Sequence, residues 1–263
     1  SERNQLNLYR QIVPTLVNDI WSELKVIGVK DIFVSEHAER LGETLKDPAY
    51  AEIMSLILPT PQGRVRSLHE KITRTYEIWL LTKVARALHE LGARSQSDIL
   101  WISFTTNEPA LKMSYKDKVI YIMYQPSIVP HIISGFVPQL PKPFHAVPDI
   151  AVMILDEEKY IEWGDLRKYA DYVPLLVDAK LSLAGETRYE SVETVMRQVE
   201  AYRLLMNKKP KVIVPIYYRN ASAVYRLRTK EGAIAIDEVN PDNSTKVHIF
   251  FNYVKKVIEE VLL

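Results

Sequence analysis

The sequence contains no cysteine in 263 residues, which excludes a disulfide framework, thiolate zinc sites and thiol catalysis. An intracellular, cytoplasmic setting is therefore expected. The chain also lacks a charge excess, because 34 Lys and Arg oppose 33 Asp and Glu, for a net charge of +1. A general basic coat is excluded, so any contact with nucleic acid must come from a local patch. The first residue is Ser1 rather than Met, which is compatible with a fragment or with the loss of a targeting segment.

Two motif classes are missing as well. The sequence has neither a Gly-x-Gly-x-x-Gly motif nor a Gly-Lys-Ser/Thr phosphate loop, so a nucleotide-driven motor within this chain is excluded. The 6 histidines are scattered, and no two of them stand four residues apart as they do on a zinc-binding helix. The sequence therefore excludes a phosphate-loop nucleotide site and a zinc site built from two histidines on one helix.

A stretch without Asp, Glu, Lys or Arg runs from Val119 to Pro141 and is long enough to span a membrane. It contains several prolines, which remove backbone donors and break helices, and in lipid the freed carbonyls would find no partner. The stretch is therefore predicted to be a strand that runs into a proline-rich loop, residues 126–147. We expect a soluble protein that does not engage a membrane.

The residues that are present have an ordinary globular composition, 47% hydrophobic and 25% charged. The length suits one large α/β domain, or a core with a smaller appendage. Apolar residues at helical spacing predict helices within residues 1–58 and 67–91, and the prolines and glycine of residues 59–63 mark a boundary between them. We therefore expect an N-terminal helical region, residues 1–66, followed by a second region, residues 67–263.

Short runs rich in β-branched and aromatic residues follow, and they predict strands. These runs are Ile99–Phe104, Val119–Tyr124, Ile150–Leu155, Leu175–Val177, Val212–Tyr218, Val224–Arg228 and Ala233–Ile236. A helix over Ser191–Met206 interrupts them, and the last helix carries Ile249, Tyr253, Val257 and Val261 on its apolar side. This order predicts an α/β fold in which helices flank a mixed sheet.

Two acids and a lysine stand at the ends of two of these strands. Asp149, in Pro-Asp, precedes one strand, and Asp178-Ala179-Lys180 directly follows another. Residues two apart in a strand point to the same face, so Asp178 and Lys180 should lie side by side; Asp149 converges on Asp178 if the strands are neighbours. Two adjacent carboxylates repel each other unless a cation neutralises them, and Mg²⁺ takes carboxylates and waters in this way. The arrangement is typical of metal-assisted phosphodiester hydrolysis, with the lysine orienting or activating a water.

An acid-x-Lys tripeptide also arises by chance, about twice in a chain with this share of charged residues. Two others occur here, Glu23-Leu24-Lys25 and Glu157-Glu158-Lys159. Only Asp178-Ala179-Lys180 has a preceding apolar strand, a Pro-Asp dipeptide upstream and a helix downstream. The alternative for each tripeptide is a solvated charge pair.

The Pro-Asp and Asp-x-Lys elements resemble the two signature elements of the PD-(D/E)xK nuclease superfamily, and Gln198 and Tyr202 resemble the Gln-xxx-Tyr motif of its RecB-like branch. The resemblance implies a restriction-endonuclease-like core, metal ligation by Asp149 and Asp178, and a catalytic role for Lys180. It also implies Mg²⁺ as the cofactor, with Mn²⁺ as a substitute, and it associates Gln198 and Tyr202 with the active site and with DNA. From the residues alone, Gln198 and Tyr202 share a helix face, and the alternatives are a surface glutamine and a core tyrosine.

The superfamily often adds an acid from the helix before its first strand, and Glu77 occupies that place. Its neighbours at helical spacing are mostly apolar, so a buried carboxylate there would be costly without a partner, and a metal ion would satisfy it. The alternative is an ion pair with Arg74 on a partly exposed edge. The implied metal ligands are therefore Asp149, Asp178 and Glu77.

The segment from Thr75-Tyr76-Glu77-Ile78-Trp79 to Leu91-Gly92, preceded by Leu58-Pro59, is similar to the McrC-like nucleases. These are nuclease partners of a GTP-driven motor in modification-dependent restriction. The resemblance covers residues 50–218 and implies DNA as the substrate, with an NTP-driven motor subunit or a further domain as a partner. Nothing in the sequence identifies a surface for docking that motor.

A basic cluster with interleaved tyrosines lies near the C-terminus. Its members are Lys208, Lys209, Lys211, Tyr217, Tyr218, Arg219, Tyr225, Arg226, Arg228 and Lys230. Such a cluster can bind phosphates and stack on bases, although lysines also protect sheet edges from aggregation. Our main hypothesis is a Mg²⁺-dependent deoxyribonuclease. The alternative is a catalytically inactive subunit that keeps the nuclease fold and serves DNA binding or assembly.

Overall fold

The computed structural model describes residues 2–34, 68–103, 108–129, 146–158, 161, 164–181 and 191–262. The predicted boundary at residues 59–63, the helical pattern within residues 35–58 and most of the proline-rich loop lie outside these residues.

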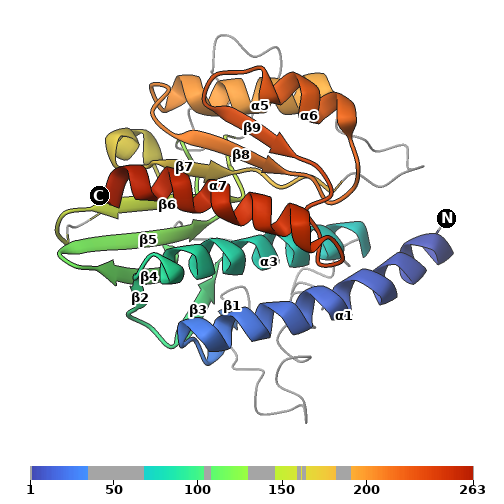
Figure 1. Cartoon of the computed structure of the whole chain (residues 1–263), viewed down its shortest axis with the longest axis horizontal. Coiled ribbons are helices and arrows are strands. Elements are labelled where there is room, and N and C mark those ends of the chain that lie inside the picture. The colour runs from blue at the N-terminus through green and yellow to red at the C-terminus, as the bar shows by residue number, and fades with distance from the viewer. Residues whose placement is uncertain are drawn as a thin grey trace.

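A mixed sheet forms the centre of the protein, and seven strands of it fall in the described residues (Figure 1). In spatial order they are β2 (Arg94–Ser95), β4 (Pro109–Tyr115), β5 (Lys118–Tyr124), β6 (Ile150–Leu155), β7 (Leu175–Val177), β8 (Lys211–Pro215) and β9 (Ala233–Ile236). Neighbours from β2 to β7 are antiparallel, whereas β7, β8 and β9 run parallel. Parallel strands need crossover connections, and here α5 (Val192–Leu205) and α6 (Ala221–Arg228) provide them. The predicted α/β class with a mixed sheet is confirmed.

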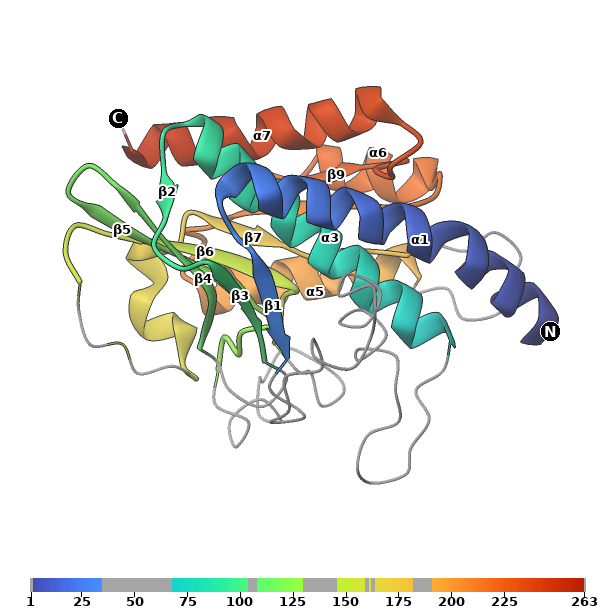
Figure 2. The same cartoon turned by 90° about the horizontal axis from the view of Figure 1, so that it is seen from below.

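Helices cover both faces of this sheet (Figures 1 and 2). On one face lie α1 (Glu2–Ile27), α3 (Leu68–Glu90) and α7 (Ser244–Leu262); on the other lie α5, α6 and the short 3₁₀ helix η2 (Leu166–Tyr172). Strand β6 shows why two layers are needed. Its alternate residues enter the two separate apolar cores, so the strand is buried on both sides and reads as a continuous apolar run.

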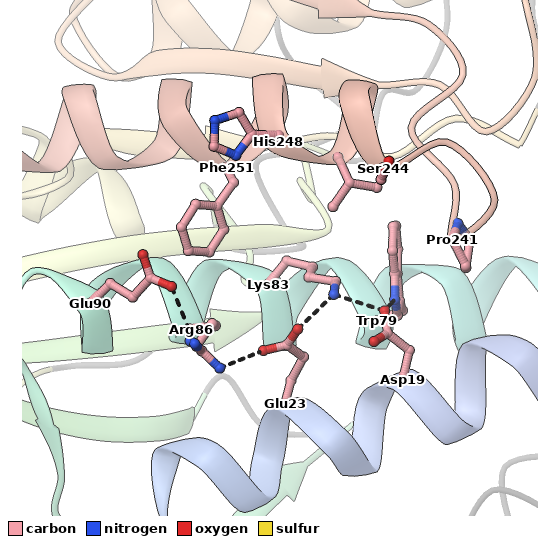
Figure 3. Close-up of a pocket in the computed structure, with 11 residues that line it drawn as sticks. Asp19, Glu23, Trp79, Lys83, Arg86, Glu90, Pro241, Ser244, His248 and Phe251 are labelled. Atoms are coloured by element: carbon pink, nitrogen blue, oxygen red, sulfur yellow. Dashed lines mark hydrogen bonds and ion pairs between the residues drawn. The ribbon is translucent and has the colours of Figure 1, made fainter.

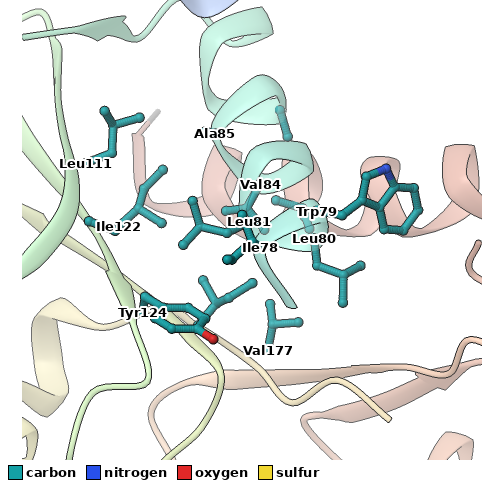
Figure 4. Packing of buried hydrophobic residues seen from close by; sticks show 14 of the residues in the cluster. Ile78, Trp79, Leu80, Leu81, Val84, Ala85, Leu111, Ile122, Tyr124 and Val177 are labelled. Atoms are coloured by element: carbon teal, nitrogen blue, oxygen red, sulfur yellow. The ribbon is translucent and has the colours of Figure 1, made fainter. Parts of the chain in front are cut away.

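Helix α3 is enclosed on several sides, which explains its apolar composition. Figure 4 shows Ile78 and Leu81 of α3 facing Ile122 and Tyr124 of β5, while Trp79 points away from the sheet. The indole Nε1 of Trp79 donates a hydrogen bond to Asp19 of α1 at 2.5 Å. Helix α1 therefore packs on α3, and its apolar residues belong to the same core.

The prediction of helix beyond residue 27 is wrong for the described part of that segment. Helix α1 ends at Ile27, where Gly28 takes a positive φ of 84° that favours glycine. The chain then forms β1 (Asp31–Val34), which pairs in parallel with β3 (Ile99–Ile102). The partner strand lies far along the chain, so local periodicity gave no sign of this pairing.

The predicted strand Val224–Arg228 is also wrong, because these residues belong to helix α6. The Asn220 side chain caps this helix by accepting a hydrogen bond from the Ala223 amide at 3.2 Å. Val224 and Leu227 are buried at helical spacing. The β-branched and aromatic residues of this short segment had suggested a strand, whereas the cap and the packing favour a helix.

For α7, the predicted helix is confirmed, whereas its predicted apolar side is confirmed only in part. The buried residues are Phe250, Val254, Ile258 and Leu262, whereas Tyr253 and Val261 are exposed. Ile249 and Val257 of the predicted side are half-buried and pack against the same core. No helix within the described residues is both long enough and apolar enough to cross a membrane.

Candidate active site

The acids Asp149 and Asp178 meet where β6 and β7 end. Asp149 immediately precedes β6 and Asp178 immediately follows β7, and the two antiparallel strands pair Ile150 with Val177. One step further along this register brings position 149 opposite position 178. The backbone amide of Ala179 donates to Asp149 Oδ2 at 2.6 Å. The convergence expected from the sequence is therefore present in the structure.

The Asp178-Ala179-Lys180 tripeptide is held against β8 by backbone hydrogen bonds. The amide of Asp178 donates to Ile213 at 3.0 Å, and the amide of Lys180 donates to Pro215 at 2.9 Å. Strand-like geometry thus continues past β7, and side chains two apart fall on one side. Lys180 Nζ lies 3.0 Å from Asp178 Oδ2, as the spacing predicted.

Helix α5 contributes Gln198 and Tyr202, which lie one helical turn apart. Lys180 Nζ donates to Gln198 Oε1 at 3.0 Å, and the Tyr202 hydroxyl lies 3.3 Å from Asp178 Oδ1 and 3.2 Å from the Val147 carbonyl. Tyr202 is a core tyrosine as well, because it is only 2% exposed. Both residues of the Gln-xxx-Tyr pair therefore contact the Asp-x-Lys element.

Glu77 approaches from α3, which lies on the opposite face of the sheet from α5. Only 5% of its surface is exposed, and its Oε2 accepts hydrogen bonds from the Tyr124 hydroxyl at 2.7 Å and from Gln125 Nε2 at 2.9 Å. The sequence had not singled out Tyr124 or Gln125. Local spacing could not find them, because they meet Glu77 only when β5 packs against α3.

Burial and the neighbouring acids disfavour the ionised form of Asp149. The pKa of Asp149 lies well above its ordinary value, first because of burial and then because of the negative charges of Glu77 and Asp178. Burial also raises the pKa of Glu77, and the Tyr124 hydrogen bond and the positive charges of Arg74 and Lys180 counteract that rise. A bound cation would offset this repulsion and stabilise the ionised carboxylates.

The donor chemistry suits a hard divalent cation such as Mg²⁺. Within the described residues, no group of three or more His, Asp or Glu side chains is placed so that it could hold a metal ion, so the three predicted ligands Asp149, Asp178 and Glu77 do not form such a group. Magnesium commonly binds through one or two carboxylates and keeps several waters, so Asp149 and Asp178 are sufficient ligands in number and type. Asp149 and Lys180 are half-buried, whereas Asp178 is buried.

Neighbouring acids neutralise part of the basic cluster. Several of its cations are paired with acids: Lys209 with Asp171, Arg226 with Glu193 and Lys230 with Glu200. Tyr217 is buried and packs edge-on against Tyr76, whereas Tyr225 of α6 is 74% exposed. A DNA contact through this cluster stays a prediction, and Tyr225 is its most accessible aromatic side chain.

A separate pocket of about 360 Å³ lies between α1, α3 and α7 (Figure 3). Its polar centre is Lys83, whose Nζ lies 2.7 Å from both Asp19 and Glu23. None of the six residues predicted for the catalytic site lines this pocket. The polar cluster joins α1 to α3, on the side of α3 that faces away from the sheet.

No family model matches the chain, and no curated protein matches it either.

Proposed function

We propose that this protein is a metal-dependent DNA nuclease that hydrolyses phosphodiester bonds. The observation that most strongly supports this proposal is the meeting of Asp149, Asp178 and Lys180 at the shared end of β6 and β7. The charge of Glu77 acts on the same point from the other layer of the protein. A solvated charge pair, the alternative for an isolated acid-x-Lys tripeptide, would not be buried with further carboxylates around it.

In this proposal, Asp149 and Asp178 hold a Mg²⁺ ion, with Glu77 assisting. When bound, the ion polarises the phosphate and makes a bound water more acidic. Lys180 keeps its ammonium beside Asp178, where it can orient the attacking water and counter the charge that develops on phosphorus. Gln198 fixes that ammonium, and Tyr202 fixes the Asp178 carboxylate. Mn²⁺ is expected to replace Mg²⁺, because both accept oxygen ligands.

The proposal includes DNA as the substrate, and an NTP-driven motor subunit or a further domain as a partner. The chain itself has no phosphate-binding loop, so motor activity would have to be supplied by another polypeptide or domain. The resemblance to McrC-like and RecB-like nucleases supports this part of the proposal.

The test is a cleavage assay on supercoiled plasmid and on single-stranded DNA, with Mg²⁺ or Mn²⁺ and with or without a chelator. Wild-type protein should cut with either metal and stop when the chelator is added. Asp149→Ala should reduce the rate by at least about 10³-fold, because a metal ligand acts together with the rest of the site.

The matched control is Asp156→Ala. Asp156 follows the other end of the same strand, β6, and its exposed carboxylate pairs with Lys118. This variant should cut at the wild-type rate. Retained cleavage in folded Asp149→Ala protein would refute the assignment, and DNA binding without cleavage by either metal would favour the inactive nuclease-fold subunit.

A further inference from the structure

We infer that Gln125 is a positioning residue that orients the Glu77 carboxylate and ties it to the backbone of Asp149. The inference rests on the proposed function. The side-chain amide Nε2 of Gln125 donates to Glu77 Oε2 at 2.9 Å, and its backbone amide donates to the Asp149 carbonyl at 2.8 Å. Gln125, which directly follows β5, therefore connects the Glu77 carboxylate on α3 with the backbone of Asp149 before β6.

The backbone of Gln125 takes a conformation that is costly for glutamine. Its φ is +46°, in the left-handed region that residues other than Gly, Asn and Asp seldom adopt. The residue also precedes Pro126, a position that is biased towards extended backbone. Glycine would meet the backbone requirement at lower cost, so the glutamine amide is the feature that needs another explanation.

The hydrogen bonds also select one oxygen of Glu77. Tyr124 and Gln125 both donate to Oε2, which fixes the carboxylate from two directions. Oε1 is then the oxygen that serves a metal ion or a metal-bound water. Partners that orient metal-ligating carboxylates act on the metal through geometry, and their loss commonly weakens metal binding by about 10- to 100-fold.

The test measures Mn²⁺ binding by electron paramagnetic resonance in wild-type protein and in Gln125→Gly, with thermal unfolding measured in parallel. Glycine accepts the left-handed φ but removes the amide, so Gln125→Gly should unfold at or above the wild-type temperature. Its Mn²⁺ affinity should fall by about 10- to 100-fold. The matched control is Lys116→Gly, which removes another left-handed side chain (φ 52°) in the turn between β4 and β5. It should leave Mn²⁺ affinity unchanged.

The outcomes separate this inference from the nuclease proposal. If wild type and Gln125→Gly bind Mn²⁺ equally, Gln125 does not position the acids, while the nuclease proposal stands. If Gln125→Gly unfolds well below wild type, the glutamine is structural and the inference is overturned. If Asp149→Ala binds Mn²⁺ as wild-type protein does, or if wild-type protein binds none, the proposed function itself fails.

Discussion

At the scale of single residues, the raised pKa of Asp149 has a consequence for stability. Burial and the neighbouring charges of Glu77 and Asp178 make the folded protein hold the Asp149 proton more tightly than the unfolded chain does. The contribution of this proton to stability is present at acid pH and is lost as the pH rises through the folded-state pKa. The buried Asp149 carboxyl therefore makes the free energy of unfolding lower at neutral pH than at acid pH.

We predict that Asp149→Asn is more stable than wild type at neutral pH without metal. The neutral amide avoids the cost of the buried charge and can still accept the hydrogen bond from Ala179. The gain in unfolding temperature should shrink as the pH falls towards 4, because wild-type Asp149 is then protonated too. Thermal unfolding across this range measures the effect. A gain that is the same at every pH would contradict the charge explanation.

Some residues of the candidate site could be predicted from the sequence, and others could not. Asp149, Asp178 and Lys180 stand out because each is adjacent to an apolar strand, and their order along the chain is enough to suggest that they meet. Gln198 and Tyr202 share a helix face for an equally local reason. Gln125, by contrast, is 48 residues from Glu77, and only the packing of β5 against α3 brings the two together.

At the scale of secondary-structure elements, Lys83 of α3 links that helix to α1 through two ion pairs. The Lys83 ammonium lies 2.7 Å from Asp19 and 2.7 Å from Glu23, and its side chain is almost entirely buried (Figure 3). Removing one partner from a buried ion pair leaves the other charge uncompensated. Lys83→Ala should therefore lower the free energy of unfolding by about 3 kcal/mol, as measured by urea denaturation.

The control for this prediction is an exposed ion pair. Lys30 lies 3.7 Å from Asp98, and both side chains are largely in solvent. Lys30→Ala should change stability by only about 0.5 kcal/mol or less, because water screens the pair. Equal effects of the two substitutions would show that Lys83 does not fasten α1 to α3.

The sequence predicts best the elements that are buried on both faces. Strands β6 and β7 have the predicted bounds because they are buried on both faces and consist of uninterrupted apolar residues. Helix α6 is short and contains Val224 and Tyr225, which also favour strands, whereas the Asn220 cap and the packing of Val224 and Leu227 favour the helix. Helix α7 carries two apolar rows, and tertiary packing decides which of them is fully buried.

At the scale of the whole molecule, the candidate site lies between the two helical layers at one end of the central sheet. Glu77 comes from the layer of α1, α3 and α7, whereas Gln198 and Tyr202 come from the layer of α5 and α6. The order of strands places β6 beside β7 and β7 beside β8, which aligns the three segments that carry or support the acids. Sequence patterns predicted the fold class but not this strand order, because pairing between distant strands has no local signature.

The most direct test of the central claim is an anomalous diffraction map from crystals of the protein soaked in Mn²⁺. We predict a single strong peak between the carboxylates of Asp149 and Asp178, with Glu77 reaching it directly or through a water. Crystals of Asp149→Ala should lack this peak. A wild-type map with no peak beside these two acids, at Mn²⁺ concentrations that support DNA cleavage, would contradict the account.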